Sequence, residues 1–316
     1  MYGESTGYFL TCGAFAVAAG ANRRRWEERL RLSEAWLRTL WSNPLPQTRH
    51  YLSAVNDWRN HAVFTFDCAI MLRGLASRES EGAQSARRAI MEQLSRHIGD
   101  DGTLLSHFLS TGNALPTRWS TAPGPYLVKA AAALLSTQDS NSEIRAAAER
   151  TVRRWQNFYA THELAGDLHP LLYYLEGLFL LSVLREPTEC AAPNTLLSVY
   201  TKVLLLQRSD GSLPQNVEDP DSASRADVIA QALRLGCLLL SAGYLRQSLW
   251  MQRLERLAHC LETFIDESGG VRFQHTDGTS SQLNVWCTIF SYQALLLYGR
   301  IRHGHRIEEP LVRSIA

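Results

Sequence analysis

The sequence contains none of the short signatures that identify several large classes of enzyme. It has no GxSxG nucleophile elbow, no phosphate-binding P-loop, no GxGxxG dinucleotide turn and no HExxH zinc-binding helix. It also has no aspartate-rich DDxxD cluster, which argues against a terpene cyclase that holds a diphosphate through magnesium. Because no residue pattern requires a metal ion or another cofactor, we expect neither.

Charge of either sign is not in excess. The chain has 316 residues, and its 32 Lys and Arg side chains against 31 Asp and Glu give a formal net charge of +1. No broad basic field is available for nucleic acid or for anionic lipid. We therefore expect a saccharide or another small molecule, and not a nucleic acid, to be the partner of this protein.

Long uninterrupted hydrophobic runs are also missing. Arg73, Lys129, Glu176 and Arg234 each interrupt an apolar stretch before it is long enough to cross a bilayer. Glu4, and not a positively charged segment, precedes the first apolar stretch, which argues against a signal peptide. The six cysteines form no CxxC pair, so a zinc site of the usual kind is not expected. These features predict a cytoplasmic protein without membrane insertion.

What the sequence does contain is a repeat of six apolar helical segments, which begin about every 45–60 residues. They cover residues 7–18, 66–75, 126–135, 171–181, 227–240 and 285–297. More amphipathic helices fit between them, over residues 26–41, 86–98, 142–159, 195–206 and 249–265. The pattern predicts an all-α fold, a single (α/α)6-type toroid with six inner and about six outer helices over residues 1–303. Residues 304–316 are expected to form a polar, frayed C-terminal tail.

Three similar turns support one continuous ring. Each follows an amphipathic helix, places a glycine where a left-handed residue ends the helix, and then returns to an apolar position. The glycines are Gly102, Gly211 and Gly269. Because the turns recur with the helices, the sequence predicts one domain without a linker.

The turns that lead into the six apolar helices carry the candidate functional residues. In a closed ring these helix N-termini face one opening, where unpaired N–H groups and the helix dipole suit anionic or hydroxyl-rich ligands. The turns offer carboxylate, imidazole, guanidinium and aromatic groups, the mixture that sugar recognition needs. We predict acid–base roles for Asp67, His169, Glu176 and Asp227. The predicted substrate-binding residues are Glu4, Tyr8, Arg118, Trp119, Tyr173, Arg225, Gln231, Asn284 and Trp286, of which Tyr8, Trp119 and Trp286 would stack on the sugar.

Each of these residues also has a purely structural interpretation. Asp67 and Asp227 stand where first-turn acids stabilise a helix, and Arg225 is close enough in sequence to pair with Asp227. Glu176 is surrounded by apolar residues, so it is either a functional carboxylate or half of a buried ion pair. For Trp119 and Trp286, packing in the core is the default expectation.

At the same turns the sequence resembles bacterial exopolysaccharide-biosynthesis proteins with an α/α-toroid fold. The matching stretches are YGESTGY at 2–8, FD at 66–67 with LRGL at 72–75, HPLLY at 169–173 with LEGL at 175–178, RADV at 225–228 with AQALR at 230–234, and LNVW at 283–286. Gly3 and Cys68 depart from the family pattern, which has Pro and a small residue there. The family is similar in fold to unsaturated glucuronyl hydrolases and sugar epimerases. The resemblance implies a role in acting on or handling glycans.

The first functional hypothesis is therefore an enzyme that acts on a sugar or acidic oligosaccharide by acid–base chemistry. Hydrolysis, elimination and epimerisation remain alternatives, because all three use similar residues. The second hypothesis is a non-catalytic glycan-binding or scaffold subunit of a polysaccharide-synthesis complex. The third is a tailoring enzyme for a small natural product, with a mouth narrowed near Trp119 and the PGP sequence at 123–125.

Overall fold

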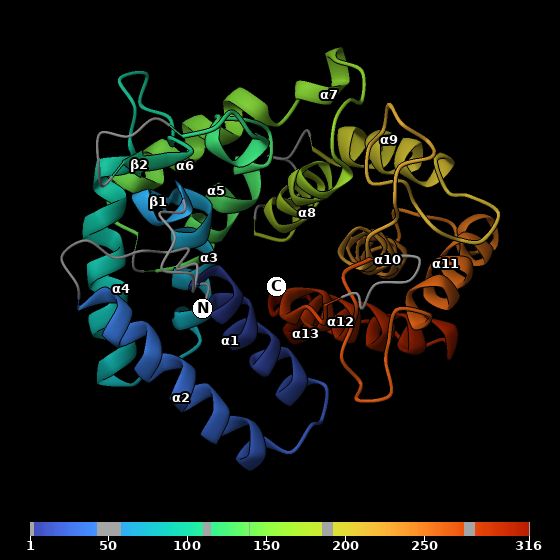
Figure 1. The fold of residues 1–316 in the computed structure, drawn as a ribbon, viewed down its shortest axis with the longest axis horizontal. Coiled ribbons are helices and arrows are strands. Elements are labelled where there is room, and N and C mark those ends of the chain that lie inside the picture. Colours follow the sequence, from blue (N-terminus) through green and yellow to red (C-terminus); the bar gives the residue numbers. More distant parts are fainter. Residues whose placement is uncertain are drawn as a thin grey trace. The chain divides into compact units, whose positions relative to one another are not determined.

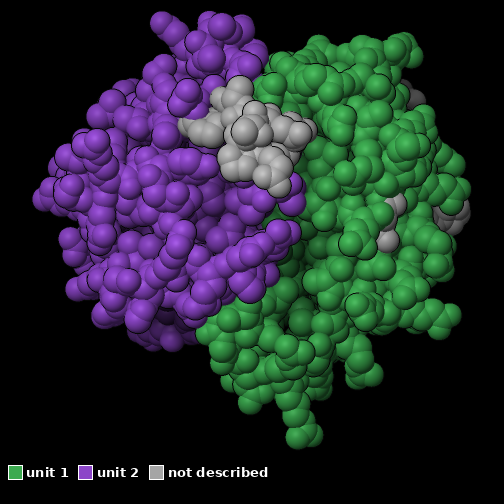
Figure 2. All heavy atoms as spheres, turned by 180° about the vertical axis from the view of Figure 1, so that it is seen from behind, with its two compact units in different colours: residues 1–156, 316 green, residues 157–315 purple. Residues whose placement is uncertain are grey.

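The computed structural model describes residues 3–42, 58–109, 115–138, 140–184, 192–274 and 282–315, and these are mainly helical (Figure 1). The chain forms two compact units, coloured separately in Figure 2. Unit 1 is residues 1–156 with residue 316, and unit 2 is residues 157–315. The prediction of a toroid domain over 1–303 followed by a tail stays a prediction.

Unit 1 contains six helices and two short strands within its described residues. The elements are α1 (Gly3–Ala18), α2 (Arg23–Trp41), β1 (Ala62–Phe64), α3 (Thr65–Ala76), α4 (Glu81–Leu94), β2 (His107–Leu109), α5 (Leu127–Ser136) and α6 (Ser142–Trp155). The apolar helices α1, α3 and α5 pack side by side, and α2, α4 and α6 contact them from their amphipathic faces. Asn22, Ser80 and Asn141 cap the amphipathic helices by accepting a backbone N–H three residues ahead.

The elements of unit 2 in its described part are helices, which are joined by turns and isolated β-bridges. These helices are α7 (Phe158–Thr161), α8 (Leu168–Leu184), α9 (Ala192–Leu205), α10 (Ala226–Ser241), α11 (Gln247–Glu262), α12 (Val285–Arg302) and α13 (Glu309–Arg313). Helix α10 contacts α8, α11 and α12 and is buried from Ala226 to Leu239. A largely apolar run is what a helix surrounded by other helices requires.

The six predicted apolar segments are confirmed, since they lie in α1, α3, α5, α8, α10 and α12 to within one residue. The three repeated turns are confirmed as well. Gly102, Gly211 and Gly269 have φ of 73°, 89° and 80°, the left-handed region that glycine adopts without strain. In each turn an aspartate side chain accepts a backbone N–H two residues ahead, as Asp101 does from Thr103 at 2.9 Å. The local sequence therefore sets these turns.

Two features differ from the predictions. The strands β1 and β2 form an antiparallel pair in which Val63 lies opposite Phe108, in a segment without the alternating pattern of a strand. The C-terminal segment is not frayed, because it contains α13 and buries Ile307, Leu311 and Ile315. The prediction of a frayed tail is wrong because the segment has three buried apolar side chains, Leu311 within α13 and Ile307 and Ile315 on either side of it.

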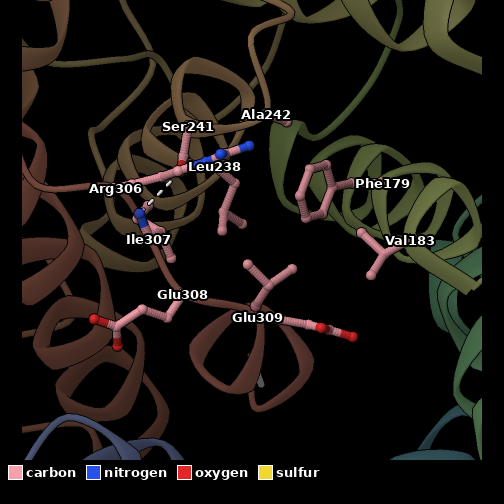
Figure 3. A pocket seen from close by; sticks show the side chains of 10 residues that line it. Phe179, Val183, Leu238, Ser241, Ala242, Arg306, Ile307, Glu308 and Glu309 are labelled. Atoms are coloured by element: carbon pink, nitrogen blue, oxygen red, sulfur yellow. Dashed lines mark hydrogen bonds between the residues drawn. The ribbon is translucent and has the colours of Figure 1, made fainter.

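A cavity of about 520 Å³ lies in unit 2, where the C-terminal segment passes the ends of α8 and α10. Figure 3 shows Phe179 and Val183 facing Leu238 across it, with Ile307 and Glu309 on the side of α13. The backbone N–H of Ile307 donates to Ser241 Oγ at 2.9 Å and fixes the segment to α10. Since Phe179, Val183 and Leu238 belong to the last turns of their helices, this cavity is distinct from the helix starts that carry the predicted site.

None of the helices in the described part of the chain is both long and apolar enough to cross a membrane.

Candidate active site

His169 lies in the first turn of α8 and is nearly buried, with 7% of its surface exposed. The chain enters this turn in an extended form, with Asp167 bridged to Asn216 and the N–H of Leu168 donating to Gln215 O at 2.8 Å. Pro170 follows, and proline suits the first turn of a helix because its missing N–H is not needed there. The backbone on both sides therefore holds the imidazole in place.

Asp227 lies at the corresponding position of α10 and is fully buried. The guanidinium of Arg225 binds it with two nitrogens, with Nε at 3.0 Å from Oδ1. Oδ1 also accepts the N–H of Val228 at 3.0 Å. Arg225 in turn lies 4.5 Å above the ring of Phe273, whose carbonyl accepts the N–H of Ala226. The predicted pairing of Arg225 with Asp227 is thus present.

These two helix starts meet in a polar contact. His169 Nδ1 is 3.2 Å from Asp227 Oδ2 and 2.8 Å from Gln231 Oε1. Burial alone would raise the pKa of Asp227, but His169 and Arg225 outweigh this effect and keep the pKa below its usual range. Asp227 is therefore an ionised carboxylate in direct contact with the imidazole.

Glu176 lies two turns further along α8 and is buried among apolar residues. It is paired with Arg234 of α10, whose Nε donates to Glu176 Oε1 at 3.1 Å and whose second nitrogen binds the same oxygen. Arg234 also donates to Gln293 Oε1 of α12 at 2.6 Å and lies 4.5 Å above the ring of Phe290. Glu176 is thus half of a buried ion pair, and Gln231 Nε2 lies 3.4 Å from its other oxygen.

Aromatic rings and the start of α12 surround this group. The ring of Tyr173 is 4.3 Å from that of His169, and Trp286 meets Phe273 edge to face at 6.4 Å. Asn284 caps α12 by accepting the N–H of Cys287 at 3.1 Å. Asn284 is half-buried at that helix start, and part of the Trp286 side chain is exposed. Unit 2 therefore brings together six of the predicted site residues, His169, Tyr173, Glu176, Arg225, Asp227 and Gln231, with Asn284 and Trp286 on the adjoining helix start.

The remaining predicted residues belong to unit 1. Asp67 is fully buried in the first turn of α3, and Glu4 is half-buried in the first turn of α1. Tyr8 is buried, and its hydroxyl accepts from Lys129 Nζ at 3.4 Å. Two more predicted residues lie in a 3-10 turn before α5, where Trp119 meets Tyr126 at 5.1 Å and the exposed Arg118 lies 5.9 Å from the ring of Trp58.

The sequence predictions did not assign a role to three polar residues, Lys129, Arg234 and Gln293. Lys129 is 1% exposed and lies 5.0 Å from the Tyr8 ring, while Arg234 and Gln293 are fully buried. Lys129 and Arg234 could have been selected from the sequence, because each is a cation inside an apolar helix and burying a charge without a partner is costly. Among the described residues, no group of three or more His, Cys, Asp or Glu side chains is arranged to hold a metal ion.

No protein-family model matches the chain, and no curated protein matches it in sequence. The resemblance to exopolysaccharide-biosynthesis proteins therefore stays a prediction, and Tyr2 of its first stretch lies outside the described residues.

Solved structures do match the chain over most of its length. Cellobiose 2-epimerase from Bacillus thermoamylovorans B4167 is similar with a TM-score of 0.71 and 9% identity, over 94% of this chain and 87% of that one. A D-mannose isomerase gives 0.69 and 13% identity, over 95% and 88% of the two chains. A glycosyl hydrolase of family 88 from Bacteroides vulgatus gives 0.59 and 10% identity, over 94% and 90%. The chain therefore has an all-α fold of the α/α-toroid class, as the helix repeat predicts.

Proposed function

We propose that this protein is an enzyme that acts on a saccharide, with His169 as its acid–base group. The observation that carries the proposal is the contact between the His169 imidazole and the buried, ionised Asp227 at 3.2 Å. A carboxylate on Nδ1 leaves Nε2 as the nitrogen that takes up or releases a proton. The similar structures are named as an epimerase, an isomerase and a glycosyl hydrolase, which supports a saccharide as the substrate.

Substrate binding is assigned to residues at the helix starts. In unit 2 these are Asn284, Trp286 and the exposed part of Arg225, close to His169. An indole face stacks on the apolar face of a pyranose, and a guanidinium binds a uronate carboxylate or a hydroxyl. Glu4, Tyr8, Asp67, Arg118 and Trp119 of unit 1 keep their predicted roles as part of this proposal.

The reaction that this geometry favours is proton transfer at a carbon next to a carbonyl or carboxyl group, as in epimerisation, isomerisation or elimination. Hydrolysis by two carboxyl groups needs one that is protonated near neutral pH. In unit 2 Asp227 has a lowered pKa and Glu176 is bound by Arg234, so neither is suited to that role. An imidazole is a group that can exchange a proton near neutral pH.

Proton exchange in deuterated water tests this proposal. The purified protein is incubated with a panel of neutral and uronic mono- and oligosaccharides, and NMR follows deuterium uptake at the carbon beside the carbonyl or carboxyl group. We expect uptake or turnover for one sugar class and its loss in His169→Gln. The matched control is His162→Gln, an exposed histidine of the same unit, which should keep full activity.

A second candidate function is saccharide binding without turnover. It is favoured by the fact that both carboxylates near His169 are neutralised by arginines, as they would be in a purely structural network. A thermal-shift screen separates the two, since a ligand at about 100 times its Kd adds roughly 2.7 kcal/mol of stability. A shift for one sugar class without exchange or turnover would support binding alone. No shift for any saccharide would contradict both candidates and favour the natural-product alternative.

A further inference from the structure

We propose that Glu176 is a positioning residue that acts through Gln231 and fixes which ring nitrogen of His169 carries the proton. This inference rests on the proposed function in one respect, namely that His169 moves a proton during the reaction. It assigns Glu176 and Gln231 to the orientation of the imidazole instead of to contact with substrate.

The direction of the hydrogen bonds that join these residues is set at Arg234. A guanidinium only donates hydrogen bonds, and two of its nitrogens bind one oxygen of Glu176. Both side chains are almost completely buried, so the pair is a carboxylate facing a cation. An ionised carboxylate only accepts. Whatever faces the other oxygen of Glu176 must therefore donate to it.

Gln231 is the residue that faces this oxygen. Its amide nitrogen must point to Glu176, at 3.4 Å from Oε2, and its amide oxygen consequently points to His169 Nδ1 at 2.8 Å. An amide oxygen only accepts, so Nδ1 must carry a hydrogen. Both polar atoms of Gln231 are thus used inside the protein, and this side chain is fully buried.

The orientation of the Gln293 amide, at the other end of this series of contacts, is also fixed by its hydrogen bonds. Gln293 donates its amide N–H to the carbonyl of Ser314 at 3.2 Å, which turns its oxygen towards Arg234. A backbone carbonyl only accepts, so this amide cannot be reversed without losing both contacts. The hydrogen bonds from Arg234 therefore favour the ionised state of Glu176. At His169, the Asp227 carboxylate is a second acceptor, 3.2 Å from Nδ1.

Glu176→Gln reverses this direction. The new amide would keep its oxygen on Arg234 and present its N–H to Gln231. Gln231 must then turn its own oxygen to this N–H and its own N–H to His169. Nδ1 would then face the N–H of Gln231 beside the Asp227 carboxylate, so the preference for a proton on Nδ1 would weaken without being lost. We expect the Nε2–H population of His169 to rise in this variant, with kcat falling at least about tenfold and KM changing much less.

The measurement is nitrogen NMR of 15N-histidine-labelled protein without substrate, with the His169 signals identified by their absence in His169→Gln. In the wild type we expect neutral His169 to carry its proton on Nδ1. The matched control is Gln293→Met, a fully buried glutamine one link beyond Arg234, which should leave the tautomer unchanged. In a Gln231→Met background, Glu176→Gln should no longer alter the His169 signals, because methionine cannot form the two hydrogen bonds that join residue 176 to His169.

Glu176→Gln leaves Arg234 buried without its partner, and such a variant can fail to fold. Glu176→Gln combined with Arg234→Met removes the ion pair as a unit and gives the same readout. There no ion pair fixes the direction of the Gln231 amide, so the Nε2–H population should exceed that of the wild type by less than in Glu176→Gln, because Asp227 still accepts from Nδ1.

A wild-type His169 with its proton on Nε2, or a tautomer unchanged in both Glu176 variants, would overturn the inference even if saccharide turnover is found. The expected tautomer changes without turnover of any saccharide would uphold the orientation and overturn the proposed function alone. The two failures are thus separable, because the NMR signals require no substrate.

Discussion

His97 is a fully buried histidine of unit 1, and each nitrogen of its ring has a hydrogen-bonding neighbour. Its Nδ1 is 2.8 Å from Thr65 Oγ1, its Nε2 is 3.1 Å from Gln93 Nε2, and Thr65 also donates to the carbonyl of Leu105. The Gln93 N–H donates to Nε2, and the Thr65 hydroxyl, which donates to Leu105, accepts from Nδ1. The ring is therefore neutral with its proton on Nδ1. Burial, and to a lesser extent His107 and Arg96, lower the pKa of His97 to about 3.

This pKa predicts an acid-sensitive stability. An unfolded histidine binds a proton near pH 6.5, whereas folded His97 stays neutral down to about pH 3. The free energy of unfolding that depends on neutral His97 is fully present above pH 6.5. It is lost as the pH falls from there towards 3, by about 2 kcal/mol at pH 5. Urea unfolding at pH 7 and pH 5 should therefore show a larger loss for the wild type than for His97→Gln. The exposed His305→Gln should lose as much as the wild type, and equal losses in all three proteins would contradict the assignment.

At the scale of single residues, the sequence was enough to select the candidate site residues but not the side chains that they contact. His169, Asp227 and Arg225 could be selected because each stands beside the start of an apolar helix, and Arg225 and Asp227 are close in the chain. The contacts of Glu176 with Arg234 and of Arg234 with Gln293 could not be predicted, because they join residues 58 and 59 positions apart, respectively. Contacts between helices depend on rotation and crossing, which helix periodicity does not specify.

At the scale of the elements, the backbones of helices α1 and α3 come very close to each other. A methyl group on Gly74 would overlap the carbonyl oxygen of Gly7, and one on Gly7 would lie 2.7 Å from that of Ile70. Both glycines are in contact with backbone and not with the end of a flexible side chain. The two helices can therefore approach only because neither carries a side chain at this crossing.

Gly74→Ala should for this reason destabilise the protein, by about 1–3 kcal/mol, because the helices must move apart. Gly299→Ala is the control, since a methyl group there meets nothing within 4 Å in the interior of α12. Alanine is the better helix former, so this change should be neutral or stabilise by up to about 1 kcal/mol. Thermal unfolding of both variants checks the prediction, and a Gly74→Ala protein as stable as the wild type would contradict the close approach.

The helices could be predicted much better than the other elements. Helices such as α8 and α10 are buried on nearly all sides and therefore read as long apolar runs. The strands β1 and β2 have three residues each, too few for an alternating pattern to stand out. Helix α13 has five residues, and its contacts with the rest of unit 2, not its own helical propensity, hold it in place.

For the molecule as a whole, the free thiols offer a test that covers both units. Cys12 and Cys68 of unit 1, and Cys237, Cys260 and Cys287 of unit 2, are free and buried. Burial raises the pKa of Cys68, Cys237, Cys260 and Cys287, so the thiolate that reacts with alkylating reagents is scarce.

We expect these five thiols to resist iodoacetamide in the folded protein at pH 8 and to react completely in denaturant. Peptide mass spectrometry gives the extent of labelling for each cysteine, and the denaturant concentration of half-labelling shows whether the two units unfold together. Rapid labelling of Cys237 or Cys287 without denaturant would contradict the burial of α10 or α12. Cys190 lies outside the described residues and serves as an internal comparison.

At the scale of the whole chain, the helix repeat was enough to predict the fold class, because the spacing of apolar segments survives even where identity to known structures is only 9–13%. The specific reaction was not predictable in this way, since hydrolases, isomerases and epimerases share the fold. The meeting of all six helix starts at one opening stays a prediction.

The contact of Gln293 with the carbonyl of Ser314 has a practical consequence for work with this protein. Residues 305–315 follow the last long helix, and their sequence invites trimming or the attachment of a purification handle. Their loss would expose the apolar surface covered by Leu311 and remove the Ser314 carbonyl that accepts from Gln293, a residue two contacts away from Glu176. The intact mass of any inactive preparation should be checked for clipping before a saccharide is rejected as the substrate.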